Sequence, residues 1–201
     1  MTGIVVPFRG YGGKQRLTGL GPDVHGAVVL AMLSDVLAAT VDLGHTVVVT
    51  SDADGRRIAA EAGAEVVDDP GGGQGAAVAA ALRGFPSERV LVVNADLPCV
   101  RPEDLRTLLA VEPLDGVALV ASADGRTNVL RLPGPHLFEP LYGPRSAARF
   151  VRAARARGMA VTIAAIPNLA DDVDTPADLE LVHHRAGTHT RAVLDGVRLA
   201  S

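Results

Sequence analysis

A run of aliphatic residues followed closely by an acidic residue is the feature of this sequence that most constrains its fold. Residues 90–93 are Val-Leu-Val-Val, and Asp96 follows just before Leu97 and Pro98. A continuous apolar run of this kind is typical of a strand buried on both faces, as in parallel sheets covered by helices. Ligands of open α/β sheets bind at the carboxyl ends of such strands. The segment therefore predicts a central strand that delivers a carboxylate to a binding site, although Asp96 could merely start a turn before Pro98.

Short β-branched or apolar runs alternate with helical patterns along the chain. We expect strands over residues 4–7, 46–50, 64–67, 90–93, 117–121, 128–132 and 160–165, with helices over 24–41, 54–62, 75–82 and 146–157 and from Pro102 and Pro176. This alternation predicts βαβ units and a mostly parallel sheet. The expected fold is a three-layer, Rossmann-like α/β domain over residues 1–183. The C-terminal tail, residues 184–201, is expected to be irregular or to add a helix over 191–199.

Composition excludes several classes of protein. The chain has 201 residues, 48% of them hydrophobic, which suffices for one α/β core. A net charge of −4 with mixed signs argues against a nucleic-acid partner. The longest apolar runs fall short of the roughly 20 residues that a membrane span requires, and no basic segment precedes the first strand as in a signal peptide. Cys99 is the single cysteine, so no internal disulfide forms. We expect a cytoplasmic protein without a membrane partner.

Two glycine-rich loops are candidates for binding a nucleotide. The first, residues 8–22, carries Lys14 and Arg16 among its glycines, which would let backbone N–H groups and positive charge approach a phosphate. Gln15 after the lysine breaks the signature of P-loop nucleotide-binding proteins, and a solvated surface loop is an equally compatible interpretation. The second loop, residues 70–75, leads into a helix. Its four glycines exceed what a turn needs and favour a site where a purine lies against the backbone.

Acidic residues suggest a metal site. Magnesium takes oxygen ligands, usually one or two carboxylates together with substrate phosphates. Asp96 and Asp174 could supply carboxylates from two strand ends, and Asp172 could join them from the same face of an extended segment or remain solvated. Near the start of the 146–157 helix, the Gly143 N–H, the Ser146 hydroxyl and the helix dipole could together hold an anion, although an ordinary Ser146 N-cap explains that segment as well.

Taken together and in order, these segments resemble the 2-phospho-L-lactate and phosphoenolpyruvate guanylyltransferases of coenzyme F420 biosynthesis. The motifs that carry the resemblance are Val-Pro-x-Arg with Lys-x-Arg-Leu at residues 6–17, Pro-Gly-Gly-Gly at 70–73, Ala-Asp-Leu-Pro at 95–98, Asp-Gly-Arg-Thr-Asn at 124–128, Tyr-Gly-x-x-Ser at 142–146, and Asp-Val-Asp-Thr-Pro-x-Asp-Leu at 172–179. The family is similar to the molybdenum-cofactor guanylyltransferases, which implies a GT-A-like nucleotidyltransferase fold.

The resemblance also implies roles for individual residues. Mg²⁺ would be held by Asp96, Asp172 and Asp174, and catalysis would involve Lys14, Arg16, Asp96 and Asp174. The nucleotide would contact Pro7, Gly72, Gly73, Gly75 and Asp96, and the phosphorylated three-carbon acid would contact Asn128, Gly143 and Ser146. One departure stands out: the family usually has Leu-Asn where this chain has Gln74-Gly75, so a side chain expected near the base is missing.

The predicted reaction transfers GMP from GTP to phosphoenolpyruvate or 2-phospho-L-lactate and releases pyrophosphate. The attacking phosphate is already an anion at neutral pH, which agrees with the lack of a His or Cys nucleophile motif. The sequence leaves open the choice among phosphoenolpyruvate, phospholactate and phosphoglycerate, and a homodimer is a candidate oligomeric state. The alternatives are another nucleotidyltransferase, acting on a sugar nucleotide or a molybdopterin, and a non-catalytic nucleotide-binding module.

Overall fold

A seven-stranded sheet forms the centre of the protein. The computed structural model describes residues 2–13, 17, 20–86 and 89–199. The strands are β1 (Gly3–Pro7), β2 (His45–Val49), β3 (Glu65–Val67), β4 (Val90–Val93), β5 (Val117–Ala121), β6 (Thr127–Leu132) and β7 (Val161–Ile163), in the order β3-β2-β1-β4-β6-β5-β7. Strand β6 runs antiparallel to β4 and β5, and the other strand pairs are parallel. The mostly parallel sheet predicted from the sequence is therefore confirmed.

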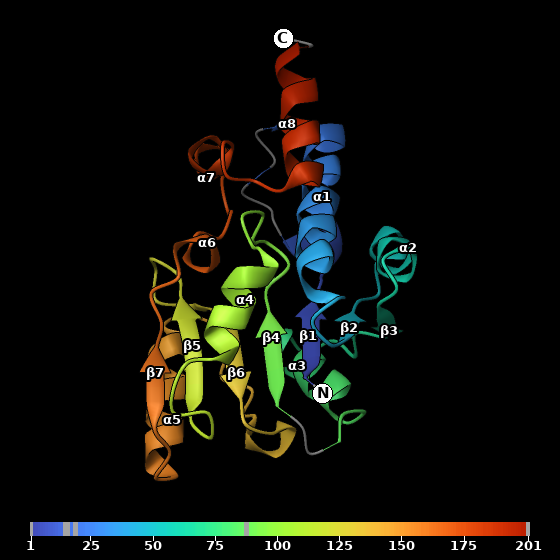
Figure 1. Cartoon of the computed structure of the whole chain (residues 1–201). Coiled ribbons are helices and arrows are strands. Elements are labelled where there is room, and N and C mark those ends of the chain that lie inside the picture. The colour runs from blue at the N-terminus through green and yellow to red at the C-terminus, as the bar shows by residue number, and fades with distance from the viewer. Residues whose placement is uncertain (1, 14–16, 18–19, 87–88, 200–201) are drawn as a thin grey trace.

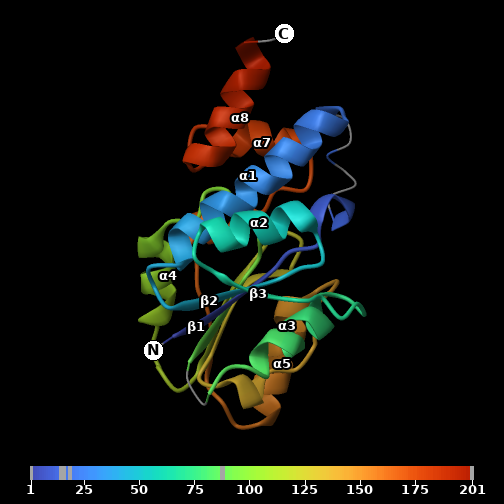
Figure 2. The same ribbon diagram turned by 90° about the vertical axis from the view of Figure 1, so that its right-hand side faces the viewer.

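Helices cover both faces of this sheet, which gives the three layers expected from the sequence. In Figures 1 and 2, α1 (Pro22–Thr40), α2 (Ala53–Glu61) and α4 (Pro102–Leu109) lie on one face, and α3 (Gln74–Leu82) and α5 (Ser146–Ala156) lie on the other. Each face has its own apolar core, one under α1, α2 and α4 and one under α3 and α5. Burial of β4 between them explains why that strand has no polar residue: all four of its side chains are fully buried.

Helix α1 is the longest helix of the described residues and is largely apolar. Its stretch Asp23–Thr40 is long and apolar enough to cross a membrane by composition, but 61% of that stretch is buried inside the fold. Met32, Leu33 and Leu37 are among its fully buried side chains. The apolar character of α1 is accounted for by its place in the core.

The C-terminal segment is helical and attached to the main body. After α6 (Pro167–Ala170) and α7 (Pro176–Val182), the chain forms α8 (Thr188–Leu199), which lies along α1 (Figure 1). The buried carboxylate of Asp35 on α1 accepts hydrogen bonds from the N–H groups of His189 and Thr190, at 3.0 and 2.9 Å. It thereby satisfies the first turn of α8, as an N-cap residue would. Of the two alternatives for the tail, the helix is the one formed, and it is longer than expected.

Candidate active site

A cavity of about 340 Å³ opens at the edge of the sheet where β1 and β4 end. Because β6 is antiparallel to β4, its first residues lie at this same edge. The cavity therefore collects residues that are far apart in the sequence. Its lining includes Pro7, Arg9, Gly10, Gly12, Asp69, Gln74, Asn94, Asp96, Arg126, Thr127, Asn128, Tyr142, Gly143, Ser146, Asp172 and Asp174.

Three carboxylates meet in this cavity. Asp96, Asp172 and Asp174 each offer an oxygen atom, and these atoms lie within 4.8 Å of one another. The N–H of Val173 donates to the carbonyl of Asp96 at 3.1 Å, which joins the segment between α6 and α7 to the end of β4. The Val173 side chain is fully buried, so in this extended segment its two neighbours point the opposite way, into the cavity. The structure thus brings together the three aspartates that the sequence suggested.

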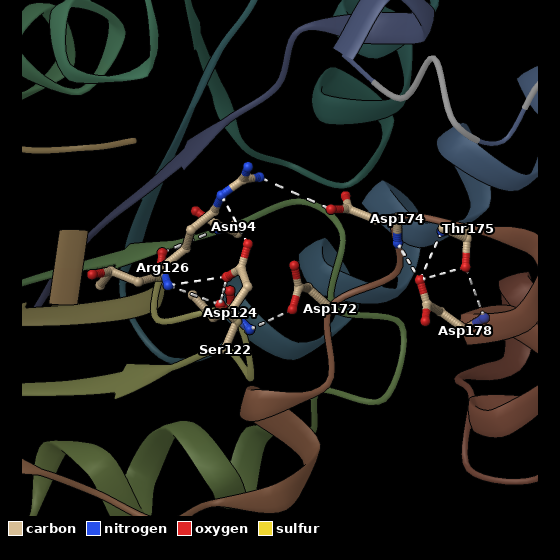
Figure 3. A network of polar contacts seen from close by, with 10 residues as sticks. Asn94, Ser122, Asp124, Arg126, Asp172, Asp174, Thr175 and Asp178 are labelled. Atoms are coloured by element: carbon tan, nitrogen blue, oxygen red, sulfur yellow. Dashed lines mark hydrogen bonds and ion pairs between the residues drawn. The ribbon is translucent and has the colours of Figure 1, made fainter. Parts of the chain in front are cut away.

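The backbone around Asp174 is fixed by the start of α7. Asp178 Oδ2 accepts hydrogen bonds from the N–H of Asp174 at 3.0 Å and from the N–H and hydroxyl of Thr175 at 2.7 and 2.9 Å (Figure 3). Thr175 in turn caps the helix by accepting from the N–H of Asp178. This reciprocal arrangement is a capping box, which the Thr-Pro-x-Asp sequence predicts. It holds the Asp174 carboxylate at a defined position on the cavity wall.

Asn128 orients a second carboxylate. Its side-chain amide donates to the carbonyls of Leu169 and Ala170, both at 3.1 Å, and to Asp172 Oδ1 at 3.3 Å. Carbonyl oxygens only accept, so these contacts fix which end of the amide carries the nitrogen. Asn128 is 1% exposed, and within the described ranges no donor reaches its Oδ1. The three clustered carboxylates form an all-oxygen donor set, which fits a hard divalent cation.

Arg126 places a positive charge beside the carboxylates. Its Nε lies 3.0 Å from Asp124 Oδ2, and its Nη1 lies 3.9 Å from Asp174 Oδ2 (Figure 3). Asp124 Oδ1 accepts from the hydroxyl of Ser122 and from the backbone N–H of Arg126, at 2.5 and 3.1 Å, so the turn that carries the arginine is well defined. Arg126 was not among the site residues expected from the sequence. Its place two residues before Asn128, in the same motif, was the signal that could have identified it.

The segment before α5 forms another part of the wall. Gly143 has a φ of 118°, and Arg145, with a φ of 54°, is in the left-handed region that non-glycine residues seldom adopt. Both precede Ser146, which is fully buried. Its hydroxyl accepts from the N–H of Thr127 at 2.9 Å and donates to Thr127 Oγ1 at 3.1 Å.

The expectation that Ser146 is the N-cap of this helix is therefore wrong, because its hydroxyl is directed to β6 and Arg145 occupies the cap position. The N–H of Ala147 instead donates to the carbonyl of Gly125 at 3.2 Å. Ser146 and Gly143 still line the cavity, so this part of the wall joins α5 to the start of β6.

Tyr142 supplies an apolar surface to the same wall. Its ring packs edge-on against Phe150, with centroids 5.2 Å apart. Removal from water raises the pKa of the Tyr142 hydroxyl far above its ordinary value. Tyr142 therefore adds shape, without charge, to this end of the cavity.

The glycine-rich loops contribute unequally. Pro7, Gly10 and Gly12 line the cavity, whereas Gly72, Gly73 and Gly75 lie outside its lining. A side chain at Gly75 would start 2.7 Å from Cβ and 3.0 Å from Cα of Pro140, so close packing explains this glycine. Lys14 and Arg16, expected to contact phosphates, lie outside the described residues.

The open, mostly parallel α/β sheet, with carboxylates gathered at the carboxyl ends of its strands, is the fold of the nucleotidyltransferases. The fold agrees with solved structures of that class. A protein described as a nucleotide-diphospho-sugar transferase from Desulfovibrio desulfuricans G20 superposes with a TM-score of 0.79 over 98% of this chain and 97% of its own, at 18% identity. A nucleotidyl transferase from Methanothermobacter gives a TM-score of 0.66 over 92% and 97% of the two chains, at 21% identity. At these identities the likeness concerns the fold alone.

The particular family follows from the sequence. The chain belongs to the family described as "Guanylyl transferase CofC like", whose model matches residues 2–201. A phosphoenolpyruvate guanylyltransferase of Conexibacter woesei is 38% identical, covering 95% of this chain and 94% of the relative. A 3-phospho-D-glycerate guanylyltransferase of Phenylobacterium zucineum is 35% identical, covering 94% and 93%. The predicted family and the predicted nucleotidyltransferase activity are thereby confirmed.

Proposed function

We propose that the protein transfers GMP from GTP to the phosphate of phosphoenolpyruvate or 2-phospho-L-lactate, with release of pyrophosphate, in the biosynthesis of coenzyme F420. The observation that carries the proposal is a cavity lined by three clustered carboxylates together with Gly143 and Ser146. The names of the relatives support a phosphorylated three-carbon acid as acceptor, since phosphoenolpyruvate and 3-phospho-D-glycerate both belong to that class. Such a reaction uses small soluble substrates and suits a cytoplasmic enzyme.

The chemistry requires little proton transfer. An oxygen of the acceptor phosphate forms a bond to the α-phosphorus of GTP, and the bond from that phosphorus to the bridging oxygen of the β-phosphate breaks. Pyrophosphate leaves with the electron pair. The attacking phosphate is already ionised at neutral pH, so no general base is needed. The task of the protein is to bring two polyanions together and to hold them in line.

Different residues of the cavity would carry out different parts of this task. Asp96, Asp172 and Asp174 would hold Mg²⁺, which when bound would neutralise charge on the phosphates. Asn128 fixes the orientation of the Asp172 carboxylate through its amide. Arg126 is close enough to the carboxylates to contact an anionic acceptor, and its present partner Asp124 would keep its guanidinium at the cavity edge.

Two further contacts complete the proposal. The Gly143 N–H adds a backbone donor for the acceptor at the entrance to α5. Lys14 and Arg16, near the first glycine-rich loop, are proposed to contact the pyrophosphate that leaves.

A substrate matrix tests this function. Purified protein with Mg²⁺ would be incubated with each of GTP, ATP, CTP and UTP against phosphoenolpyruvate, 2-phospho-L-lactate and 3-phospho-D-glycerate, with products identified by mass spectrometry and pyrophosphate measured separately. We expect a guanylylated acid from GTP and one of the first two acceptors, together with equimolar pyrophosphate. An Asp96→Asn preparation, purified in the same way, controls for contaminating enzymes. Turnover with 3-phospho-D-glycerate alone, or none with GTP, would overturn the proposal.

A further inference from the structure

We infer that Gln74 recognises the guanine base by accepting a hydrogen bond with its side-chain oxygen. This inference rests on the proposed function and deepens it, because it names the atom that distinguishes GTP from ATP. Gln74 is the first residue of α3 and lines the cavity together with Asn94 at the end of β4. Gln74 occupies the position where the family usually has a leucine.

A chain of two amides fixes the orientation of the Gln74 side chain. Asn94 lies 3.2 Å from the carbonyl oxygen of Thr127, which can only accept, so the atom facing that carbonyl is the Asn94 nitrogen Nδ2. The other end of the Asn94 amide, Oδ1, then faces Gln74 and can only accept. The Gln74 atom 2.7 Å from it is therefore the nitrogen Nε2. It follows that the Gln74 oxygen Oε1 is the atom left for a ligand.

Reversing either amide would bring two acceptors together. A flipped Gln74 would place Oε1 against Asn94 Oδ1, and a flipped Asn94 would place Oδ1 against the Thr127 carbonyl. Both reversals lose a hydrogen bond between partly buried groups, which is costly because the groups left behind are unsatisfied. Within the described residues no donor is recorded for Gln74 Oε1. The cavity thus presents a hydrogen-bond acceptor whose identity is set by the backbone of β6.

A fixed acceptor distinguishes the two purines. The Watson–Crick edge of guanine carries the donors N1–H and N2–H₂, whereas adenine has an unprotonated N1 at the corresponding place. Guanine can therefore donate to Gln74 Oε1, and adenine would oppose it with a second acceptor. Sites that hydrogen-bond a specific edge reject the wrong analogue strongly, because buried polar groups are then left unpaired.

The neighbouring position cannot take over this role. Gly75 occupies the place of the family's asparagine, and any side chain there would begin 2.7 Å from the Pro140 side chain and 3.2 Å from the Pro140 carbonyl oxygen. An amide at residue 75 would require the segment around Pro140 to move. Recognition of the base edge by a side chain of this turn therefore falls to Gln74.

Two substitutions, one at Gln74 and one at its partner Asn94, test the inference. Gln74→Met keeps the length and removes the acceptor, and Asn94→Leu keeps Gln74 but removes the partner that orients it. Affinities for GTP, ITP and ATP would be measured by calorimetry with Mg²⁺, and competition between GTP and ATP would be followed in turnover. Arg83→Gln, an exposed position at the other end of α3, serves as the matched control.

We expect Gln74→Met to weaken GTP binding about tenfold while ATP binding changes little, with Asn94→Leu showing a smaller loss in the same direction. ITP, which lacks the 2-amino group, should bind like GTP if N1–H is the donor and like ATP if N2–H₂ is. An unchanged ratio of GTP to ATP affinity in a folded Gln74→Met protein would overturn the inference and place base recognition elsewhere, for instance at Asp69. If GTP binding depends on Gln74 but no acceptor is guanylylated, the proposed reaction fails and this inference survives.

Discussion

The two sides of the cavity are built by opposite means. On the carboxylate side, Asp172 is held by Asn128, and the backbone of Asp174 is held by Asp178. In the glycine-rich segments, Gly10 lines the cavity and Gly75 lies just outside its lining, and both are closely packed: a Cβ at Gly10 would meet Asp52 at 2.4 Å, and one at Gly75 would meet Pro140 at 2.7 Å. Placing charge needs side chains that are linked to the backbone, whereas the close approach of two segments needs residues without a side chain.

This difference predicts where substitutions act. Changes on the carboxylate side should reduce turnover with little effect on folding, because they remove charge from a polar surface. Changes on the glycine side should act through packing and therefore appear first in the stability of the protein.

The largest effect is expected at the carboxylates. Asp96→Asn and Asp174→Asn should each lower kcat by about 10³-fold, or ~4 kcal/mol of transition-state stabilisation, because an amide holds a divalent cation poorly. Asp172→Asn should lose less. Thermal unfolding should be unchanged or slightly shifted upward in all three variants, since removing one of three clustered negative charges relieves repulsion. A variant that keeps near-wild-type kcat at saturating Mg²⁺ would contradict the assignment of that residue.

Arg126 should give the next largest effect, and a selective one. Arg126→Met removes the cation next to Asp174 while keeping much of the side-chain volume. We expect kcat/KM for the acceptor acid to fall about 10- to 100-fold, the range for loss of one charge-assisted hydrogen bond, with KM for GTP changed less than threefold or so. Steady-state kinetics with each substrate varied in turn provide the measurement. Arg126→Lys, which keeps the charge, should recover part of the loss, and equal damage to both substrates would argue against a role in acceptor binding.

Much of this site could be predicted from the sequence, for identifiable reasons. The three valines and one leucine of β4 and the capping box at Thr175 are local patterns in the sequence, and each lies beside an aspartate of the site. The roles of Ser146 and Gly75 could not be predicted, because they depend on contacts with Thr127 and Pro140 that are distant in sequence. The antiparallel direction of β6, which brings Asn128 to the cavity, is likewise a property of the assembled sheet.

A substitution of Ser146 tests whether its hydroxyl stabilises the fold or binds the acceptor. Ser146→Ala removes the acceptor for the buried N–H of Thr127 and the donor to its hydroxyl, which should cost about 1–3 kcal/mol of stability. Urea unfolding would measure it. Ser34→Ala is a suitable control, because among the described residues that hydroxyl bonds to the carbonyl of Leu30 in its own helix, and its loss should be nearly neutral. If Ser146→Ala is as stable as the natural protein but has a raised KM for the acceptor alone, the hydroxyl acts in substrate binding instead.

The smallest effect is expected at Gly75. Comparing Gly75→Ala with Gly72→Ala separates the cost of close packing from the cost of an unfavourable backbone conformation. Gly75→Ala would force a methyl group against Pro140, a typical overpacking cost of about 1–3 kcal/mol, partly offset by up to about 1 kcal/mol because alanine favours the helix over glycine. Gly72→Ala, by contrast, meets nothing closer than 3.4 Å, but its φ of 79° is unfavourable for alanine by roughly 1–2 kcal/mol.

A double-mutant cycle with Pro140→Gly distinguishes the two causes. Removing the proline ring should recover about 1 kcal/mol for Gly75→Ala and nothing for Gly72→Ala, because only the first loss comes from contact with Pro140. Gly75→Asn, which would restore the residue usual in the family, should follow Gly75→Ala in stability and leave the preference for GTP unimproved. Additive losses for Gly75→Ala and Pro140→Gly, or a sharper preference for GTP in Gly75→Asn, would show that the loop adjusts and that the glycine side of the cavity is less closely packed than its contacts indicate.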